Sequence, residues 1–306
     1  MKRQHRTIVW AALAILAVVA LLARLAGGWH EKEHFAIAHA AVEAAGDDLP
    51  AFFRTDGPAA AGYGAVDPDV FKNRAAPHLH HAEQPEHFHD LEYFADEELP
   101  SERYAFLKRC YERGLDPRRV GLLPYAITEW TERLTMAMAL HRRWPDDPHV
   151  RRKCLVYAGL LAHYAGDLWQ PLHTTIHYDG RVEKAGDASP RTGVHAKMDG
   201  LLRRVELPAG WDNDVTPRVY DDVWAATLRE LRRSHARVDR VYALEDRLPG
   251  REEDRSDDAA VRRFAVELAR HATAFTASLY RTAWAKSAKV KLPDWLDRER
   301  MDALVR

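Results

Sequence analysis

One stretch near the middle of the chain constrains its fold more than any other, the segment HYAGDLWQPLH from His163 to His173. His163 and Asp167 lie four positions apart, and on a helix this spacing puts an imidazole and a carboxylate on one face, where both can bind one cation. Because proline disfavours helical geometry at the residue before it, we expect the chain to turn at Gln170, before Pro171, and to bring His173 back toward that face. The stretch therefore predicts a helix with three potential metal ligands. Taken alone, the pair could also be a His and an Asp that hydrogen-bond only each other.

The same pairing recurs further along the chain. His195 and Asp199 are again four positions apart, and a histidine-rich tract at 77–90 lies upstream, with Asp69 shortly before it. Zinc accepts imidazole nitrogen and carboxylate oxygen where thiolates are scarce, and the chain has 17 His but only two Cys. These residues offer more ligands than one zinc ion uses, so the pattern predicts a site for several zinc ions.

Hydrophobic periodicity predicts an all-α fold. After residue 28, apolar residues recur mainly at helical spacing, and no alternating strand pattern extends beyond a few residues. The expected helices cover about 31–45, 101–113, 121–141, 150–170, 217–237 and 257–287. We expect a long loop at 55–100 whose shape depends on bound metal. With 306 residues, 46% of them hydrophobic, the chain can form a single multi-helix domain around one core.

The first 28 residues differ from the rest and predict a signal peptide. A basic start is followed by an uninterrupted apolar run at 8–23 and by small residues at 26–28, where a signal peptidase would cut. Cleavage there would leave the domain 29–306 and make the protein secreted or periplasmic. The alternative is an uncleaved membrane anchor at residues 8–25, since the apolar run is at the short end of a membrane span.

Composition limits the partners and the crosslinks. Removal of the leader would take away four basic residues and no acidic one, so 41 Lys and Arg would face 46 Asp and Glu, a formal charge of about −5. A protein that grips duplex DNA through its backbone normally has a basic surplus, whereas contact with a phosphate ester at a cationic metal cluster is compatible with this charge. Cys110 and Cys154 could form a disulfide after export or remain buried thiols, and the sequence leaves both open.

Together these motifs resemble a known superfamily, which joins bacterial zinc-dependent phospholipases C to the single-strand-specific nucleases of fungi and plants. Its central His-x3-Asp-x5-His motif, with Gly-Asp and Gln-Pro inside it, is matched by residues 163–173. Mature chains of the family begin with a Trp that binds zinc through its own amino group and carbonyl, followed shortly by a His, and Trp29 and His34 fit that start. Three further family motifs are similar to segments of this chain: the upstream Asp to Asp69, the His-Phe-x-Asp segment to 87–90, and the closing His-x3-Asp to 195–199. The resemblance covers roughly residues 29–200.

What the resemblance implies is an all-α domain around a trinuclear zinc cluster. The implied ligands are Asp69, His87, His163 and Asp167 for one zinc, His173, His195 and Asp199 for a second, and Trp29 through its backbone, His34 and the other oxygen of Asp167 for a third. Asp167 would bridge two metals and be catalytic, Asp90 would be a further catalytic carboxylate that orients substrate, and Phe88 would stack on a base. Closely spaced zinc ions support in-line displacement at phosphorus, which is phosphodiester hydrolysis.

The expected function is therefore that of a secreted zinc-dependent phosphodiester hydrolase, a nuclease or a phospholipase C. The 22 positions between His173 and His195, the closing Asp199 and Phe88 favour single-stranded nucleic acid. The Asp-Pro-Asp segment at 67–69 is more similar to the phospholipases, and the Gly-Gly-Asn that follows the central motif in many of the nucleases is absent. Two alternatives remain open, a non-catalytic zinc-stabilised binding domain and a membrane-anchored protein with structural metals. No stable protein partner is implied, and membrane contact is expected only with an uncleaved leader or a lipid substrate.

Overall fold

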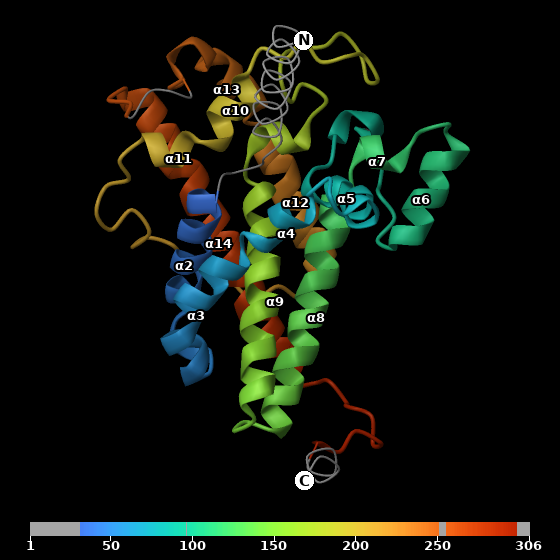
Figure 1. The fold of residues 1–306 in the computed structure, drawn as a ribbon, viewed down its shortest axis with the longest axis vertical. Coiled ribbons are helices and arrows are strands. Elements are labelled where there is room, and N and C mark those ends of the chain that lie inside the picture. Colours follow the sequence, from blue (N-terminus) through green and yellow to red (C-terminus); the bar gives the residue numbers. More distant parts are fainter. Residues whose placement is uncertain (1–30, 96, 251–254, 299–306) are drawn as a thin grey trace, which may run out of the picture.

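A computed structural model describes residues 31–95, 97–250 and 255–298, and every regular element within them is a helix (Figure 1), which confirms the predicted all-α class. The longer helices are α2 (Glu31–Ala45), α3 (Ala51–Gly64), α6 (Arg103–Glu112), α8 (Leu123–Arg143), α9 (Pro148–Asp167), α12 (Val223–His235) and α14 (Ala259–Ser287). The shorter ones are α4 (Asp67–Phe71), α5 (Pro77–Glu83), α7 (Pro117–Val120), α10 (Val194–Asp199), α11 (Leu201–Arg204) and α13 (Val238–Ala243). The 3-10 turns are η1 (Gly46–Asp48), η2 (Gln84–His87), η3 (Leu91–Phe94), η4 (Pro171–Thr174) and η5 (Glu245–Arg247).

Some of the expectations from the sequence fall outside this part of the chain. The expected leader at 1–28, its alternative as an anchor at 8–25, and the expected ligand Trp29 all lie outside the described residues. Among the described helices, none combines the length and the apolar character that crossing a bilayer requires.

Helix α9 is the element around which the others pack. It contacts α2, α3, α8 and α14, and its N-terminus is capped by Asp147, whose Oδ1 accepts hydrogen bonds from the backbone N–H groups of His149 and Val150. Apolar side chains such as Leu161 are fully buried. The helix ends at Asp167, slightly before the predicted end, and its last turn, residues 163–167, is buried.

The expected long loop at 55–100 is wrong, because α3, α4 and α5 form there. Glycine has low helix propensity, but the glycines of this region allow close packing. A Cβ atom at Gly62 would lie 2.8 Å from the Phe35 ring, and one at Gly159 would lie 2.8 Å from the Cα atom of Gly64. Close approach of α3 to α2 and α9 therefore depends on these residues, and the burial gained in that contact outweighs their low helix propensity.

The start of one predicted helix also differs in the structure. The helix predicted at 217–237 begins only at α12, because the preceding backbone bonds to α14 instead. The N–H of Arg218 donates to Ser278 Oγ, and the N–H of Tyr220 donates to Thr282 Oγ1, both at 2.9 Å. This extended segment is hydrogen-bonded to α14 and leads directly into α12.

Both cysteines are free thiols in the interior. Cys110 lies on α6 and Cys154 on α9, and both side chains are fully buried. Burial raises the pKa of the Cys110 thiol to about 11 and that of Cys154 to about 12. Of the two alternatives from the sequence, the structure has the buried thiols, and neither is set up as a nucleophile.

Candidate metal centre

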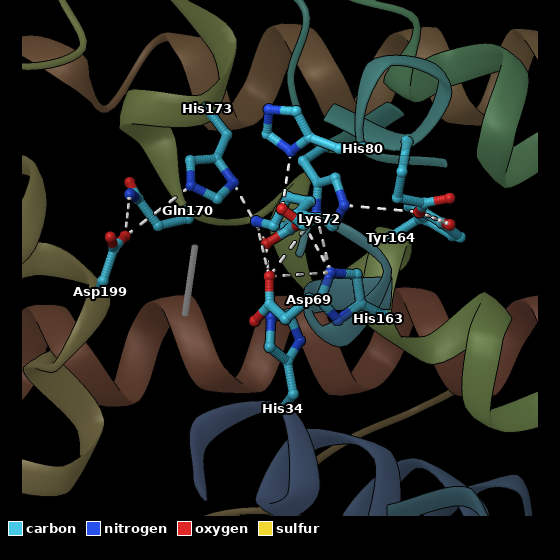
Figure 2. Close-up of polar contacts among 12 residues, drawn as sticks. His34, Asp69, Lys72, His80, His163, Tyr164, Gln170, His173 and Asp199 are labelled. Atoms are coloured by element: carbon cyan, nitrogen blue, oxygen red, sulfur yellow. Dashed lines mark hydrogen bonds and ion pairs between the residues drawn. The ribbon is translucent and has the colours of Figure 1, made fainter. Parts of the chain in front are cut away.

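Eight of the nine expected metal ligands meet at the C-terminal end of α9. Figure 2 labels five of them, His34, Asp69, His163, His173 and Asp199. The eight ligands come from six elements that are spread over residues 31–199: α2, α4, η2, α9, η4 and α10. Their ligand atoms form three groups, and within each the atoms lie within 4.8 Å of one another: His34, His163 and Asp167; Asp69, His87 and His163; His173, His195 and Asp199. The buried His and Asp groups could hold metal ions.

Asp167 connects these groups. Its carboxylate is fully buried, and its two oxygens face different imidazoles. Oδ1 lies 3.4 Å from His34 Nε2 and 3.2 Å from His173 Nδ1. Oδ2 lies 2.9 Å from His87 Nδ1 and 3.2 Å from His163 Nε2. A single carboxylate in this position can bind two cations at once, one through each oxygen.

The positions of the atoms around Asp167 are better suited to binding a metal ion than to hydrogen bonding with one another. His34 Nε2, Asp167 Oδ1 and His173 Nδ1 are buried, and none of them has a hydrogen-bond partner. A buried polar atom without a partner costs about 1–3 kcal/mol. Neighbouring ligands of a tetrahedral zinc at about 2.0–2.1 Å are about 3.4 Å apart. The separations of 3.2–3.4 Å between these atoms are close to that value.

Two of the ligands, His195 of the third group and Asp69 of the second, are partly exposed. His195 Nε2 lies 3.3 Å from Asp199 Oδ2, and His173 Nε2 lies 3.8 Å from Asp199 Oδ1. The His195 side chain is 25% exposed and that of Asp69 is 20% exposed, whereas His163 and Asp167 are fully buried. Solvent therefore reaches the centre most readily at His195 and Asp69.

Two of the imidazoles are oriented through their other ring nitrogen. His163 Nδ1 lies 2.7 Å from the carbonyl oxygen of Ala65, and His195 Nδ1 lies 3.2 Å from the carbonyl oxygen of Tyr178. In a neutral imidazole, a ring nitrogen that donates to a carbonyl leaves the other nitrogen unprotonated. Nε2 of both residues therefore points into the centre as a potential metal ligand.

The charges in the centre suit metal binding. Burial alone would raise the pKa of the Asp167 carboxyl, but His163 and His173 outweigh it and hold this pKa well below its ordinary value. Burial lowers the pKa of the His34 imidazole to about 4. At neutral pH the centre thus presents an ionised carboxylate and a neutral imidazole, the forms that bind a cation without first losing a proton. Asp199 differs, because burial raises the pKa of its carboxyl well above the ordinary value.

Lys72 is a member of the site that the sequence analysis did not identify. Its Nζ lies 2.6 Å from Asp69 Oδ1, and its side chain is 13% exposed (Figure 2). Burial acts to lower the pKa of this ammonium, but Asp69 and Asp167 outweigh it and raise the pKa above its ordinary value. The site therefore contains a permanent positive charge beside the Asp69 carboxylate. The sequence feature that could have indicated this pair is the three-residue spacing between Asp69 and Lys72, which puts both side chains on one face of a helix.

Gln170 has a second role beyond the predicted turn. Its backbone is extended at φ −89° and ψ 106°, which confirms the predicted turn before Pro171. Its side chain accepts a hydrogen bond from the N–H of Leu172 at 2.7 Å and donates to Asp199 Oδ1 at 2.8 Å. One amide therefore fixes both the turn that carries His173 and the carboxylate of the third group.

Glu83 and Tyr164 lie behind His87. The Tyr164 hydroxyl donates to Glu83 Oε1, and this oxygen lies 3.5 Å from His87 Nε2, the nitrogen that faces away from Asp167. A carboxylate behind a ligating imidazole orients the ring and increases its basicity. The sequence pattern alone indicated no role for either residue.

Phe88 and Asp90 follow His87 in a segment whose position is fixed by backbone hydrogen bonds to residues 120–123. The Phe88 carbonyl accepts from the N–H of Leu123 at 3.1 Å, and the N–H of Asp90 donates to the carbonyl of Val120 at 2.8 Å. Gly121 allows this contact, because its φ is 91° and a Cβ there would lie 2.1 Å from the Phe88 carbonyl oxygen. The Phe88 side chain is half-buried.

Asp90 lies apart from the three ligand groups. Its side chain is buried, and burial together with the neighbouring Glu92 raises the pKa of its carboxyl well above the ordinary value. Its expected catalytic role, and base stacking by Phe88, remain predictions.

No family model, curated protein or solved structure matches the chain. The fold and the site define its class: in the part of the chain that the structure describes, it is an all-helical protein with a buried cluster of His and Asp side chains that could hold metal ions.

Proposed function

We propose that this protein is a zinc-dependent phosphodiester hydrolase that cleaves single-stranded nucleic acid, within the superfamily of zinc-dependent phospholipases C and single-strand-specific nucleases. The observation that carries the proposal is the position of Asp167, a buried carboxylate whose two oxygens face two pairs of imidazoles at 2.9–3.4 Å. A bridging carboxylate of this kind holds two cations close together, which is the arrangement that in-line displacement at phosphorus uses.

Zinc is the metal that these donors favour. The cluster offers imidazole nitrogens and carboxylate oxygens and no thiolate, which suits zinc better than magnesium or calcium. Zinc bound there would act as a Lewis acid on phosphoryl oxygens and would activate water near neutral pH.

Three zinc sites follow from the geometry and the resemblance together. One would use Asp69, His87, His163 and one oxygen of Asp167; another would use His173, His195 and Asp199; the third would use His34, the other oxygen of Asp167 and the amino-terminal Trp29. The third site requires cleavage after residue 28, because only then does Trp29 carry a free amine. A cleaved leader would also make the enzyme secreted or periplasmic.

Several side chains of the chain itself would handle the substrate. A phosphate that approaches from the open side of the centre meets the Lys72 ammonium, which Asp69 holds at 2.6 Å, so this charge can bind a non-bridging oxygen. The half-buried Phe88 ring follows His87 directly and is available to stack on a base, and Asp90 would orient the substrate. Binding by stacking needs no basic surface, in agreement with the negative charge of the mature chain.

The proposal is tested by comparing three substrates with the mature, zinc-loaded protein. Single-stranded DNA, phosphatidylcholine and a bis-aryl phosphate are offered in parallel, and we expect single-stranded DNA to be cleaved fastest, with activity lost on chelation and restored by zinc. Faster cleavage of phosphatidylcholine would instead support the phospholipase C alternative. No hydrolysis of any of the three by fully zinc-loaded protein would support a non-catalytic, zinc-stabilised binding domain.

The substitution Phe88→Ala tests how the substrate is held. Base stacking contributes about 1–3 kcal/mol, so we expect KM for a single-stranded oligonucleotide to rise by at least about fivefold and KM for the bis-aryl phosphate to change little. The matched control is Tyr104→Ala, which removes an aromatic ring that is 82% exposed on α6. Equal changes in KM for both substrates would mean that Phe88 is a packing residue and not a base-binding one.

A further inference from the structure

A pocket separate from the metal centre lies on α14. Its volume is about 550 Å³, and it is lined by Pro208, Arg262, Arg263, Val266, Glu267, Arg270 and His271. None of these residues belongs to the three ligand groups of the metal centre. Except for Pro208, they occupy α14 at positions that repeat with helical spacing, so one face of the helix forms the pocket.

The pocket carries an excess of positive charge. Three arginines line it, and Glu267 is the acidic member of the lining. Glu267 is already compensated from outside the pocket, because its Oε1 accepts from Arg237 Nε at 2.8 Å and its Oε2 accepts from Arg240 Nη1 at 2.7 Å. The guanidinium groups of the lining are therefore not neutralised by Glu267.

The ion pairs of Arg262 and Arg270 are weak, although Arg270 Nε also donates a hydrogen bond to the carbonyl oxygen of Trp211. Arg262 lies 3.4 Å from Asp257 and Arg270 lies 3.5 Å from Asp214, and both carboxylates are almost completely exposed to solvent. Exposed pairs of this kind contribute about 0–1 kcal/mol. Arg262 Nε is buried and has no hydrogen-bond partner. In this region the side chains hold N–H donors that an incoming anion could use.

Arg263 has the freest guanidinium of the three. It is exposed, and among residues 31–95, 97–250 and 255–298 no carboxylate forms an ion pair with it. Arg262 and Arg263 both line the pocket, so both guanidinium groups are available to an anion that enters it.

We propose that this pocket binds a phosphomonoester of about nucleotide size. A phosphomonoester carries about −1.5 to −2 charges at neutral pH, which matches several guanidinium groups better than a single carboxylate would. The planar fork of arginine fits phosphate oxygens in pairs. A pocket of about 550 Å³ is within the usual range for small-molecule ligands, and Pro208 and Val266 give it an apolar wall for the remainder of the ligand.

His271, one residue of the lining, is held by contacts outside the pocket. The His271 ring stacks on the Trp169 ring at 4.4 Å between centroids with an interplanar angle of 15°, and Trp169 is fully buried. Arg237 Nη2 lies 3.3 Å from His271 Nε2. A preformed wall reduces the entropy that the protein loses when a ligand binds.

Calorimetric titration of the zinc-loaded protein tests this site. The probes are inorganic phosphate, a nucleoside 5′-monophosphate and phosphocholine, which share the phosphate and differ in its source. We expect Arg263→Ala and Arg262→Ala each to weaken binding at this site by about tenfold or more, because each removes charge-assisted hydrogen bonds. The matched control is Arg152→Ala on α9, which removes an exposed arginine elsewhere and should leave the affinity unchanged. Thermal unfolding of each variant checks that it is folded.

A further variant separates this site from the metal centre. Asp167→Asn should retain the binding that the arginine variants lose, so the pocket can be real even if the proposed hydrolase activity is not. Tightest binding of the nucleoside monophosphate, of phosphocholine or of phosphate itself would support the site and identify the source of its ligand. Unchanged affinity in both arginine variants, loss of all binding in Asp167→Asn, or no binding of any probe would overturn it.

Discussion

Replacing Asp167 by Asn is expected to lower turnover on a single-stranded oligonucleotide by at least about 1000-fold and to reduce the zinc content, while the fold stays helical. Loss of a group that only supports a metal ligand already costs about 10–100-fold, and Asp167 faces the ligand atoms of four imidazoles directly. Asn preserves the volume, so the packing at the end of α9 is maintained. It removes the negative charge, and it puts an N–H2 group, which cannot bind a cation, in place of one carboxylate oxygen.

Three measurements on Asp167→Asn decide this prediction: zinc per chain by metal analysis, helix content by circular dichroism, and kcat and KM. The matched control is Asp47→Asn, the same chemical change at a side chain that is 93% exposed and paired with Arg54. We expect the control to behave like the unmodified protein. Unchanged zinc content together with unchanged turnover in Asp167→Asn would remove Asp167 from the proposed site.

The parts of the site that the sequence predicted are those that local spacing determines. His163 with Asp167, and His195 with Asp199, are four residues apart and share a helix face whatever the remainder of the chain does. Pro171 forces the turn before His173 in the same local way. The structure brings together both pairs and His173.

The more distant members could not be predicted from spacing. His34, Asp69 and His87 were assigned through the resemblance to a family, because nothing local indicates that α2, α4 and η2 meet at the end of α9. The partners that orient the centre were missed for the same reason. Gln170 and Asp199 are 29 residues apart, and Tyr164 and Glu83 are 81 residues apart. Contacts over such separations depend on how the helices pack.

The incorrect prediction of a loop at 55–100 shows that tertiary packing can override the local conformational preference of a residue. Gly62 reads as a helix breaker in isolation, but within α3 it is the place where the Phe35 ring of α2 fits. A sequence pattern records local preference, and the gain from burying α3 against α2 and α9 exceeds the cost of a few poor helix formers.

Removal of metal is expected to lower the midpoint of thermal unfolding by at least about 10 °C. A ligand at about 1000 times its dissociation constant stabilises the folded state by about 4 kcal/mol per site. In a chain of this size each kcal/mol corresponds to about 2–4 °C. Chelation also leaves buried atoms such as His34 Nε2 and His173 Nδ1 without partners, which adds to the loss. Zinc should restore the midpoint and magnesium should not, because imidazole nitrogens dominate the ligand set.

Hydrogen exchange should localise this loss to the segment from α4 to η2, which supplies Asp69 and His87. This segment has little apolar anchoring of its own: α5 buries no residue, and Pro68 is the buried residue of α4. Its order therefore depends on the ligands it contributes, whereas α8 and α14 are fixed by the core and serve as the internal control. We expect amides of the segment to lose protection in chelated protein and amides of α8 and α14 to keep theirs. If protection in the segment is the same with and without zinc, Asp69 and His87 do not bind a structural or catalytic ion.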